Sequence, residues 1–136
     1  MVELIDYKVW FKLAEEEFNY ACRDLRTKGH TFFAPTCFHF HQAAEKSLKA
    51  YILFCGKQFR KIHNLVELVK ICGVDDTDFN NLLEEAGELN PFYTNTRYPV
   101  HWPANFTRQD AKMAKEAASK IVRLVRKKIS QKLPAL

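Results

Sequence analysis

The chain has 136 residues, which suits one domain and leaves too little length for two ordinary ones. Apolar residues make up 47% and charged residues 27%, a composition that excludes an intrinsically disordered chain. Only 4 Gly and 5 Pro are present, so a fold of many short strands and turns is disfavoured. We therefore predict a single domain over residues 1–136.

The net charge of +5 is concentrated in one segment. Residues 108–132 hold nine of the 21 basic residues and only two acidic ones. Such a segment suits a polyanionic partner. Cations toward the end of a helix also complement its dipole and keep an exposed face soluble. The sequence leaves both interpretations open.

Cysteine usage and hydropathy bear on the compartment and on metals. The longest strongly apolar stretch, residues 51–55, is far too short to cross a membrane, and residues 1–6 lack the apolar run of a signal peptide. No C-x-x-C pattern occurs, so we expect reduced thiols, no metal site and no cofactor. We expect a cytoplasmic protein without a membrane partner. The cysteines are spread along the chain at Cys22, Cys37, Cys55 and Cys72.

Hydrophobic periodicity predicts two long helices in the first half. Over residues 6–28 apolar side chains recur at three- and four-residue steps and form one stripe. A second helix, residues 35–56, is apolar over most of its circumference, which predicts a place at the centre of a bundle. Its polar residues share one arc, where we expect function: His39, His41, Gln42, Glu45, Lys46 and Lys49.

Three further helices are expected in the second half. A short one over residues 64–72 ends at Gly73, and the next runs from N-caps near Asp76 to residue 89, before Asn90-Pro91. Residues 92–103 form an irregular aromatic stretch. The last helix begins at a capping box, residues 107–110. Five helices with short connections predict an all-α, up-down antiparallel bundle of four to five helices.

Several chemistries find no support in the sequence. Gly-rich phosphate loops, the Rossmann fingerprint and the Glu-x-x-His pattern of di-iron bundles do not occur. What stands out is His41, Glu45 and Lys49 at successive four-residue steps, which places acid and base side by side on a helix. Taken alone, that spacing is typical of a surface ion-pair ladder.

The segment around these residues, H-Q-A-A-E-K-S-L-K-A over 41–50, resembles the signature of the HEPN family of nucleotide- and RNA-associated helical domains. Residues 14–21 resemble the family's A-x-x-D-L-x-x-A, with Glu17 in place of the usual Asp. Residues 63–68, H-N-L-V-E-L, resemble H-[DN]-L-x-x-L. Tyr93 followed by Arg97-Tyr98-Pro99 resembles Y-x-x-x-R-Y-P. The four segments occur in order and reach almost to the last helix.

The resemblance implies a homodimer that binds a nucleotide or an RNA phosphate. It also implies a minimal nucleotidyltransferase as protein partner, in a toxin–antitoxin-like pair. The ligand-binding residues implied in this chain are Glu17, His41, Gln42, Glu45, Lys49, Arg97 and Tyr98.

Other members of the family are metal-independent ribonucleases with an R-x4–6-H motif. In that chemistry the His is general acid or base and the Arg stabilises charge on the phosphate. Here Arg97 and His101 form a shortened R-x3-H with Pro99 between them. Whether the chain is an enzyme therefore stays open. One alternative is a ribonuclease toxin with Arg97 and His101 as catalytic pair, and another is a non-catalytic dimerisation module.

Overall fold

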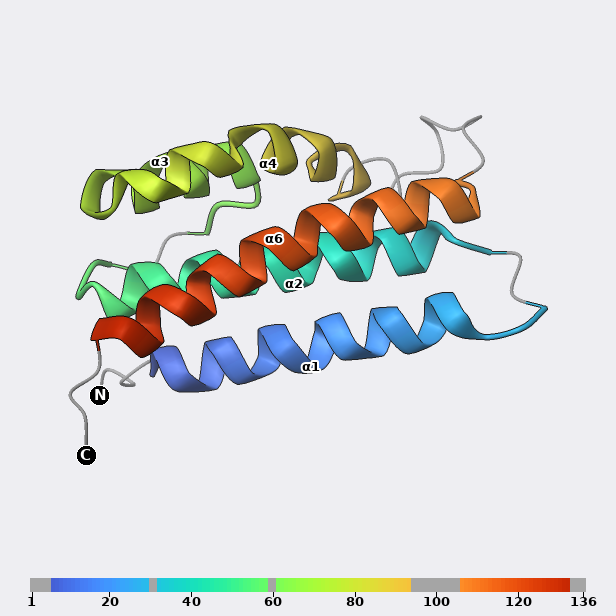
Figure 1. Ribbon diagram of the computed structural model, residues 1–136, viewed down its shortest axis with the longest axis horizontal. Coiled ribbons are helices and arrows are strands. Elements are labelled where there is room, and N and C mark those ends of the chain that lie inside the picture. The colour runs from blue at the N-terminus through green and yellow to red at the C-terminus, as the bar shows by residue number, and fades with distance from the viewer. Residues whose placement is uncertain (1–5, 30–31, 59–60, 94–105, 133–136) are drawn as a thin grey trace.

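The computed structural model describes residues 6–29, 32–58, 61–93 and 106–132. Over these residues the chain is a bundle of α-helices with one 3-10 helix, and no strand is present in the described ranges. Helix α1 (Tyr7–Arg26) lies along one side of α2 (Ala34–Phe54), helices α3 (Leu65–Asp75) and α4 (Leu83–Leu89) cover another side, and α6 (Arg108–Lys132) crosses a third (Figure 1). The predicted helical bundle is confirmed.

Helix α1 spans Tyr7–Arg26 and α2 spans Ala34–Phe54. The Asp6 side chain caps the first turn of α1 by accepting from the Lys8 amide at 2.8 Å. Helix α2 ends in a Schellman motif, in which the Lys57 amide donates to the Ile52 carbonyl at 3.1 Å. Gly56 has φ +76° there, a left-handed conformation that glycine adopts without a Cβ clash.

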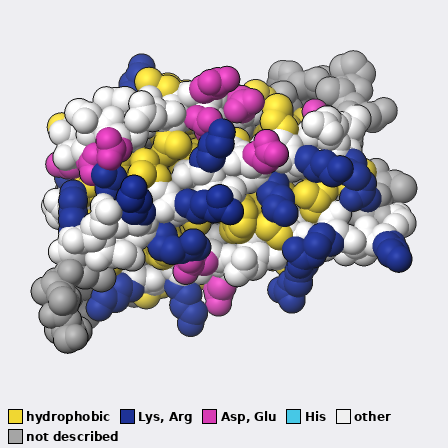
Figure 2. All heavy atoms as spheres, viewed as in Figure 1, with side chains coloured by type: hydrophobic (Ala, Val, Ile, Leu, Met, Phe, Trp, Pro, Cys, Tyr) yellow, Lys and Arg dark blue, Asp and Glu magenta, His cyan; other side chains and the backbone are white. Residues whose placement is uncertain are grey.

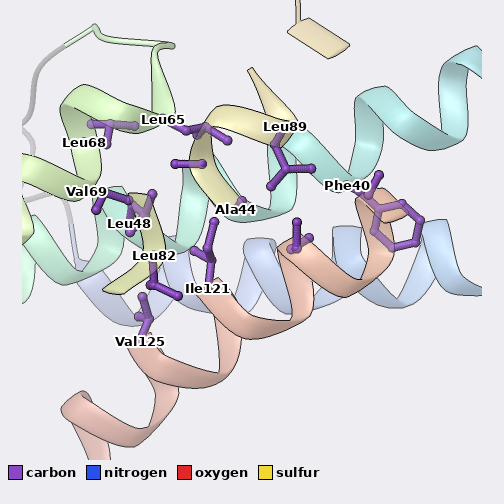
Figure 3. Close-up of a cluster of buried hydrophobic side chains, with 14 of the residues drawn as sticks. Phe40, Ala44, Leu48, Leu65, Leu68, Val69, Leu82, Leu89, Ile121 and Val125 are labelled. Atoms are coloured by element: carbon purple, nitrogen blue, oxygen red, sulfur yellow. The ribbon is translucent and has the colours of Figure 1, made fainter. Parts of the chain in front are cut away.

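Helix α2 occupies the centre of the bundle, as its apolar circumference predicts. It runs antiparallel to α1, whereas α6 runs in the same direction as α2 after the chain has passed through α3 and α4 (Figure 1). Apolar side chains from α2, α3, η1, α4 and α6 meet in one core (Figure 3). Its fully buried members include Phe40, Leu48, Leu65, Leu89, Ile121 and Val125.

Helix α3 spans Leu65–Asp75, so it continues past Gly73, which the sequence indicated as its end. The next segment begins as a 3-10 helix, η1, over Thr77–Leu82 and becomes α4 over Leu83–Leu89. A Cβ on Gly73 would stand 2.3 Å from Oδ1 of Asn80. The glycine therefore permits a close approach of η1 rather than stopping the helix.

Helix α6 spans Arg108–Lys132 and begins at the predicted capping box. The Thr107 amide donates to Asp110 at 2.8 Å, and the Asp110 amide donates to the Thr107 hydroxyl at 3.1 Å. Its buried face is rich in alanine, which brings α6 close to its neighbours in the core. Before it, residues 91–93 are helical again, although the sequence indicated irregular chain from Phe92 onward. The rest of that stretch lies outside the described residues.

Candidate functional site

The row of polar residues on α2 is buried rather than exposed on the surface. His41, Glu45 and Lys49 have relative exposures of 0%, 4% and 4%. Lys49 donates to Glu45 over the four-residue step at 3.0 Å. Nδ1 of His41 lies 4.0 Å from the same carboxylate. The predicted acid–base pairing is present, but in a setting where breaking it would leave a charge away from water.

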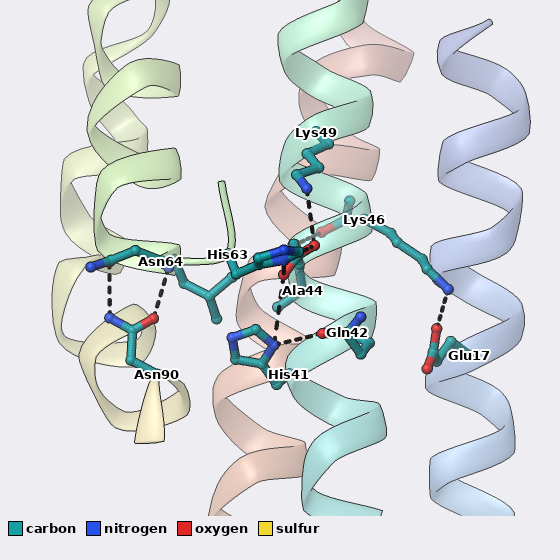
Figure 4. Close-up of polar contacts among 12 residues, drawn as sticks. Glu17, His41, Gln42, Ala44, Lys46, Lys49, His63, Asn64 and Asn90 are labelled. Atoms are coloured by element: carbon teal, nitrogen blue, oxygen red, sulfur yellow. Dashed lines mark hydrogen bonds and ion pairs between the residues drawn. The ribbon is translucent and has the colours of Figure 1, made fainter. Parts of the chain in front are cut away.

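His63, from the loop before α3, connects this buried row to the surface. Its Nδ1 donates to both carboxylate oxygens of Glu45, at 3.1 Å each, while the side chain is 45% exposed (Figure 4). The ring stacks on Tyr93, with centroids 4.5 Å apart and planes 13° from parallel. Because Nδ1 donates to Glu45, Nε2 of His63 is the ring atom left to accept a proton or a hydrogen bond.

His41 is held neutral by its surroundings. Burial lowers the pKa of His41, and it outweighs the hydrogen bond to Gln42 and the nearby Glu45, which raise it. Its Nδ1 lies 3.0 Å from Oε1 of Gln42, so Nδ1 carries the proton and Nε2 is an acceptor. By distance and angle that buried Nε2 has no hydrogen-bond partner among the described residues, although the backbone of His63 lies near the ring and raises the pKa of His41. Its ring centroid lies 5.3 Å from that of Tyr93.

Two asparagines, Asn64 and Asn90, lie beside His63 and Tyr93. Asn90 accepts from the Leu65 amide at 2.7 Å and donates to Oδ1 of Asn64 at 3.0 Å, which ties the end of α4 to the start of α3 (Figure 4). Together with His63 and Tyr93 they line an open hollow of about 190 Å³. The hollow presents two aromatic rings and two amides, groups that suit a planar, hydrogen-bonding ligand.

Glu17 belongs to a different cluster, between α1 and α2. It accepts from Nδ1 of His39 at 2.8 Å and forms an ion pair with Lys46, on the side of α2 away from His63 (Figure 4). Burial raises the pKa of Glu17, but the hydrogen bonds from His39 and Lys46 together lower it below its usual range. This arrangement joins α1 to α2.

The structure therefore divides the residues implied by the family resemblance. His41, Gln42, Glu45 and Lys49 lie together in one cluster, whereas Glu17 lies apart with His39 and Lys46. The other three fall outside the described residues: Arg97, Tyr98 and His101.

Two residues in the cluster, His63 and Tyr93, were not among the predicted site residues. Both stand in the segments that carry the family resemblance, so the signal was present in the motifs 63–68 and 93–99. What the sequence did not reveal is that the two rings stack on each other and that His63 bonds to Glu45. No group of three or more His, Cys, Asp or Glu in the described part of the chain is placed to hold a metal ion.

Comparison with known proteins identifies this arrangement of helices. The model of the HEPN domain family matches residues 7–128, nearly the whole described chain. The fold resembles the crystal structure of TT1696 from Thermus thermophilus, with a TM-score of 0.77 and 31% identity over 90% of this chain and 97% of that one. The chain belongs to the HEPN family.

A second solved structure gives the same fold. ST0689, described as an archaeal HEPN homologue, matches with a TM-score of 0.74 and 24% identity, over 93% of this chain and 99% of that one. No protein of curated function matches the chain. None of the described helices is long and apolar enough to cross a membrane.

Proposed function

We propose that the chain binds a nucleotide or an RNA phosphate at the cluster formed by His41, Glu45, Lys49, His63 and Tyr93. One observation carries the proposal: the stacked rings of His63 and Tyr93, anchored on the buried Glu45 beside an open hollow. Stacked aromatic rings and amides are the groups with which proteins hold a base. Membership of the HEPN family supports the same class of ligand.

The exposure of each side chain in the cluster indicates whether it would contact the ligand or position another residue. Lys49 is only 4% exposed and contacts Glu45, so its role is to fix the position of that carboxylate. His63 is the member open to solvent, and it would meet the ligand through Nε2 or its free face. Arg97 and Tyr98 follow Tyr93 by four and five positions in the sequence. Arg97 remains part of the proposed site because its guanidinium suits a phosphate, and Tyr98 because its ring is suited to stack on a base.

The protein partners belong to the same proposal. We infer a homodimer that acts with a minimal nucleotidyltransferase in a toxin–antitoxin-like pair, a pairing that the family resemblance in the sequence implies. Affinity purification of the native chain should recover a nucleotidyltransferase in repeated preparations. Its consistent absence would contradict the pairing and leave the ligand proposal standing.

The binding test uses AMP as probe and isothermal titration calorimetry as readout. His63→Ala and Tyr93→Leu should each abolish measurable binding while the thermal transition is retained. The chain offers a matched control in Tyr20 and His39, a second His–Tyr pair whose centroids lie 5.0 Å apart in an edge-to-face contact. Tyr20→Leu should bind AMP like the wild type. Equal losses in both pairs would refute a site at His63.

A ribonuclease is the alternative that one specific feature favours. Nδ1 of His63 is held by a carboxylate, a geometry that orients a ring for proton transfer through Nε2. Mixed-sequence RNA incubated with the protein in excess EDTA tests it, with the variants Arg97→Ala, His101→Ala and His63→Ala. Cleavage lost in Arg97→Ala and His101→Ala would support that catalytic pair. If no variant affects anything but stability, the chain is a dimerisation module.

A further inference from the structure

A strongly basic surface runs along α1 and α6. Three of its cations belong to α1, namely Lys8, Lys12 and Arg26, and the first two line a shallow groove against Ile129 of α6. Arg26 of α1 and Lys115 of α6 both lower the pKa of Cys22 by their charge, so the two cations lie near the same part of the boundary between α1 and α6. We call this surface the α1–α6 face.

The cations of α6 on this face lie in rows at helical spacing. Arg108, Lys112 and Lys115 are four and three residues apart, and Arg123 and Arg126 further along are three apart. Arg123 lies at the edge of the face, where it also lines a hollow against η1 and α4. From Arg108 to Arg126 the helix rises by about 27 Å. The positive charge therefore extends along the helix instead of gathering at one point.

Only part of this charge is neutralised within the chain. Arg126 forms an ion pair with Glu15 through Nε at 2.9 Å, and Arg108 donates to the Leu25 carbonyl at 2.7 Å. Glu15 pairs with Arg126, and Arg123 lines a hollow that also contains Asp78 and Glu85. The eight cations named above still outnumber these carboxylates and Glu116. Among the described residues, no carboxylate forms an ion pair with Lys112 or Arg123.

The α1–α6 face points away from the cluster around His63. Helix α6 lies in front of α2 in Figure 1, whereas α2 lies in front of α6 in the view that shows His63 (Figure 4). The space-filling view of the α6 side shows many Lys and Arg side chains, and of the described residues no histidine is visible in it (Figure 2). A molecule bound along α6 would therefore not reach the His63 cluster of the same protomer.

We propose that the α1–α6 face is a separate docking surface for the phosphate backbone of a nucleic acid. A linear array of cations over about 27 Å matches a polymer that carries one charge per nucleotide. A membrane surface would require bulky apolar residues on the same face. Of the exposed large apolar residues of α1, which are Val9, Leu13 and Tyr20, Tyr20 contacts His39 of α2. The apolar residues in the groove toward α6 are Tyr7, Phe11 and Ile129, and each is partly or fully buried. The proposal does not depend on ligand binding at His63.

The test measures binding of a fluorescein-labelled single-stranded RNA of about 20 nucleotides as a function of KCl concentration. Lys112→Gln combined with Arg123→Gln removes two cations that have no ion-pair partner among the described residues. If each contacts a phosphate, the slope of log K against log salt should become shallower by about 1.4, at about 0.7 per contact for a single strand. The affinity at low salt should fall with it.

The control removes two cations on another side, Lys57→Gln with Lys70→Gln, so that the net charge of both variants is equal. Because Lys57 pairs with Asp75, thermal denaturation of the control verifies that it remains folded. The control should keep the slope of the wild type. An unchanged slope in the α6 variant would refute the proposal, as would an equal change in the control. Displacement of the RNA by polyglutamate as effectively as by unlabelled RNA would indicate an acidic protein as ligand and overturn the assignment to nucleic acid.

Discussion

Nδ1 of His63 lies 3.1 Å from both carboxylate oxygens of Glu45, so a half-exposed ring from the loop before α3 is anchored on an acid buried in α2. The same carboxylate accepts from Lys49 at 3.0 Å. Glu45 therefore connects a buried cation to a ring that is open to solvent. Its removal should affect both stability and the site.

Replacing Glu45 with Gln keeps the shape of the side chain and removes its charge. Lys49 then loses its buried carboxylate, and losing one partner of a buried ion pair typically costs about 3–5 kcal/mol. We expect the free energy of unfolding, measured by urea denaturation, to fall by about 3 kcal/mol. AMP binding should also weaken, since His63 loses the acceptor that orients it.

The double variant Glu45→Gln/Lys49→Met separates charge from packing. Replacing a buried ion pair by uncharged groups of similar size is often neutral, so most of the lost stability should return. The orientation of His63 would not return with it. A single variant as stable as the wild type would show that water reaches the pair.

The sequence predicts contacts between site residues of one helix, but not contacts between site residues of different segments. His41, Glu45 and Lys49 share one helix, so the four-residue steps predict their adjacency directly. Their burial does not follow from that spacing, because it depends on which helices cover α2. The contact of His63 with Glu45 joins residues 18 positions apart through a loop, and no local pattern encodes its geometry.

The neutral, buried His41 should make stability depend on pH. Its pKa is lowered by burial from the usual 6.5, so between the folded and unfolded pKa values the unfolded chain binds more protons. The free energy of unfolding should therefore be full above about pH 6.5 and fall as the pH drops below it, by at most about 1.4 kcal/mol per pH unit for one proton. Urea denaturation between about pH 7.5 and pH 5 measures this slope.

His41→Gln removes the titrating ring while retaining a polar side chain. The variant should be less stable at neutral pH and should lose the part of the slope that His41 contributes. Glu17, whose pKa is also lowered, destabilises the fold on protonation only as the pH falls below 4.5, so its effect lies in a more acidic range. An identical slope in wild type and variant would show that His41 does not control the response.

The capping box of α6 is a feature that the sequence predicts and the structure confirms. Thr107→Ala removes the hydroxyl that accepts from the Asp110 amide, and we expect a loss of about 1 kcal/mol in the free energy of unfolding. The double variant Thr107→Ala/Asp110→Ala should lose less stability than the sum of the two single variants, because the two hydrogen bonds are reciprocal. Ser130→Ala, at an exposed position of the same helix, is the control and should leave stability unchanged or slightly higher.

Gly73 shows where sequence reasoning fails for a physical reason. A glycine after an apolar helical pattern indicates a helix end, because glycine favours the left-handed cap. Helix α3 nevertheless continues to Asp75, and Gly73 has no positive φ. Its small size matters because η1 brings Asn80 against the helix. The contact between α3 and η1 requires a residue without a side chain at position 73. The sequence pattern of α3 alone cannot predict that contact.

The effect of Gly73→Ala on the free energy of unfolding should therefore depend on Asn80, with a loss in its presence and a gain in its absence. In the wild type the new Cβ would stand 2.3 Å from Oδ1 of Asn80, so the asparagine must move, and we expect a loss of about 1 kcal/mol. In the Asn80→Ala background that obstacle is absent, and alanine inside a helix should stabilise by about 0.5–1 kcal/mol over glycine. Thermal and urea denaturation of the four proteins give the coupling energy. The same effect of Gly73→Ala in both backgrounds would mean that Asn80 is not what excludes the side chain.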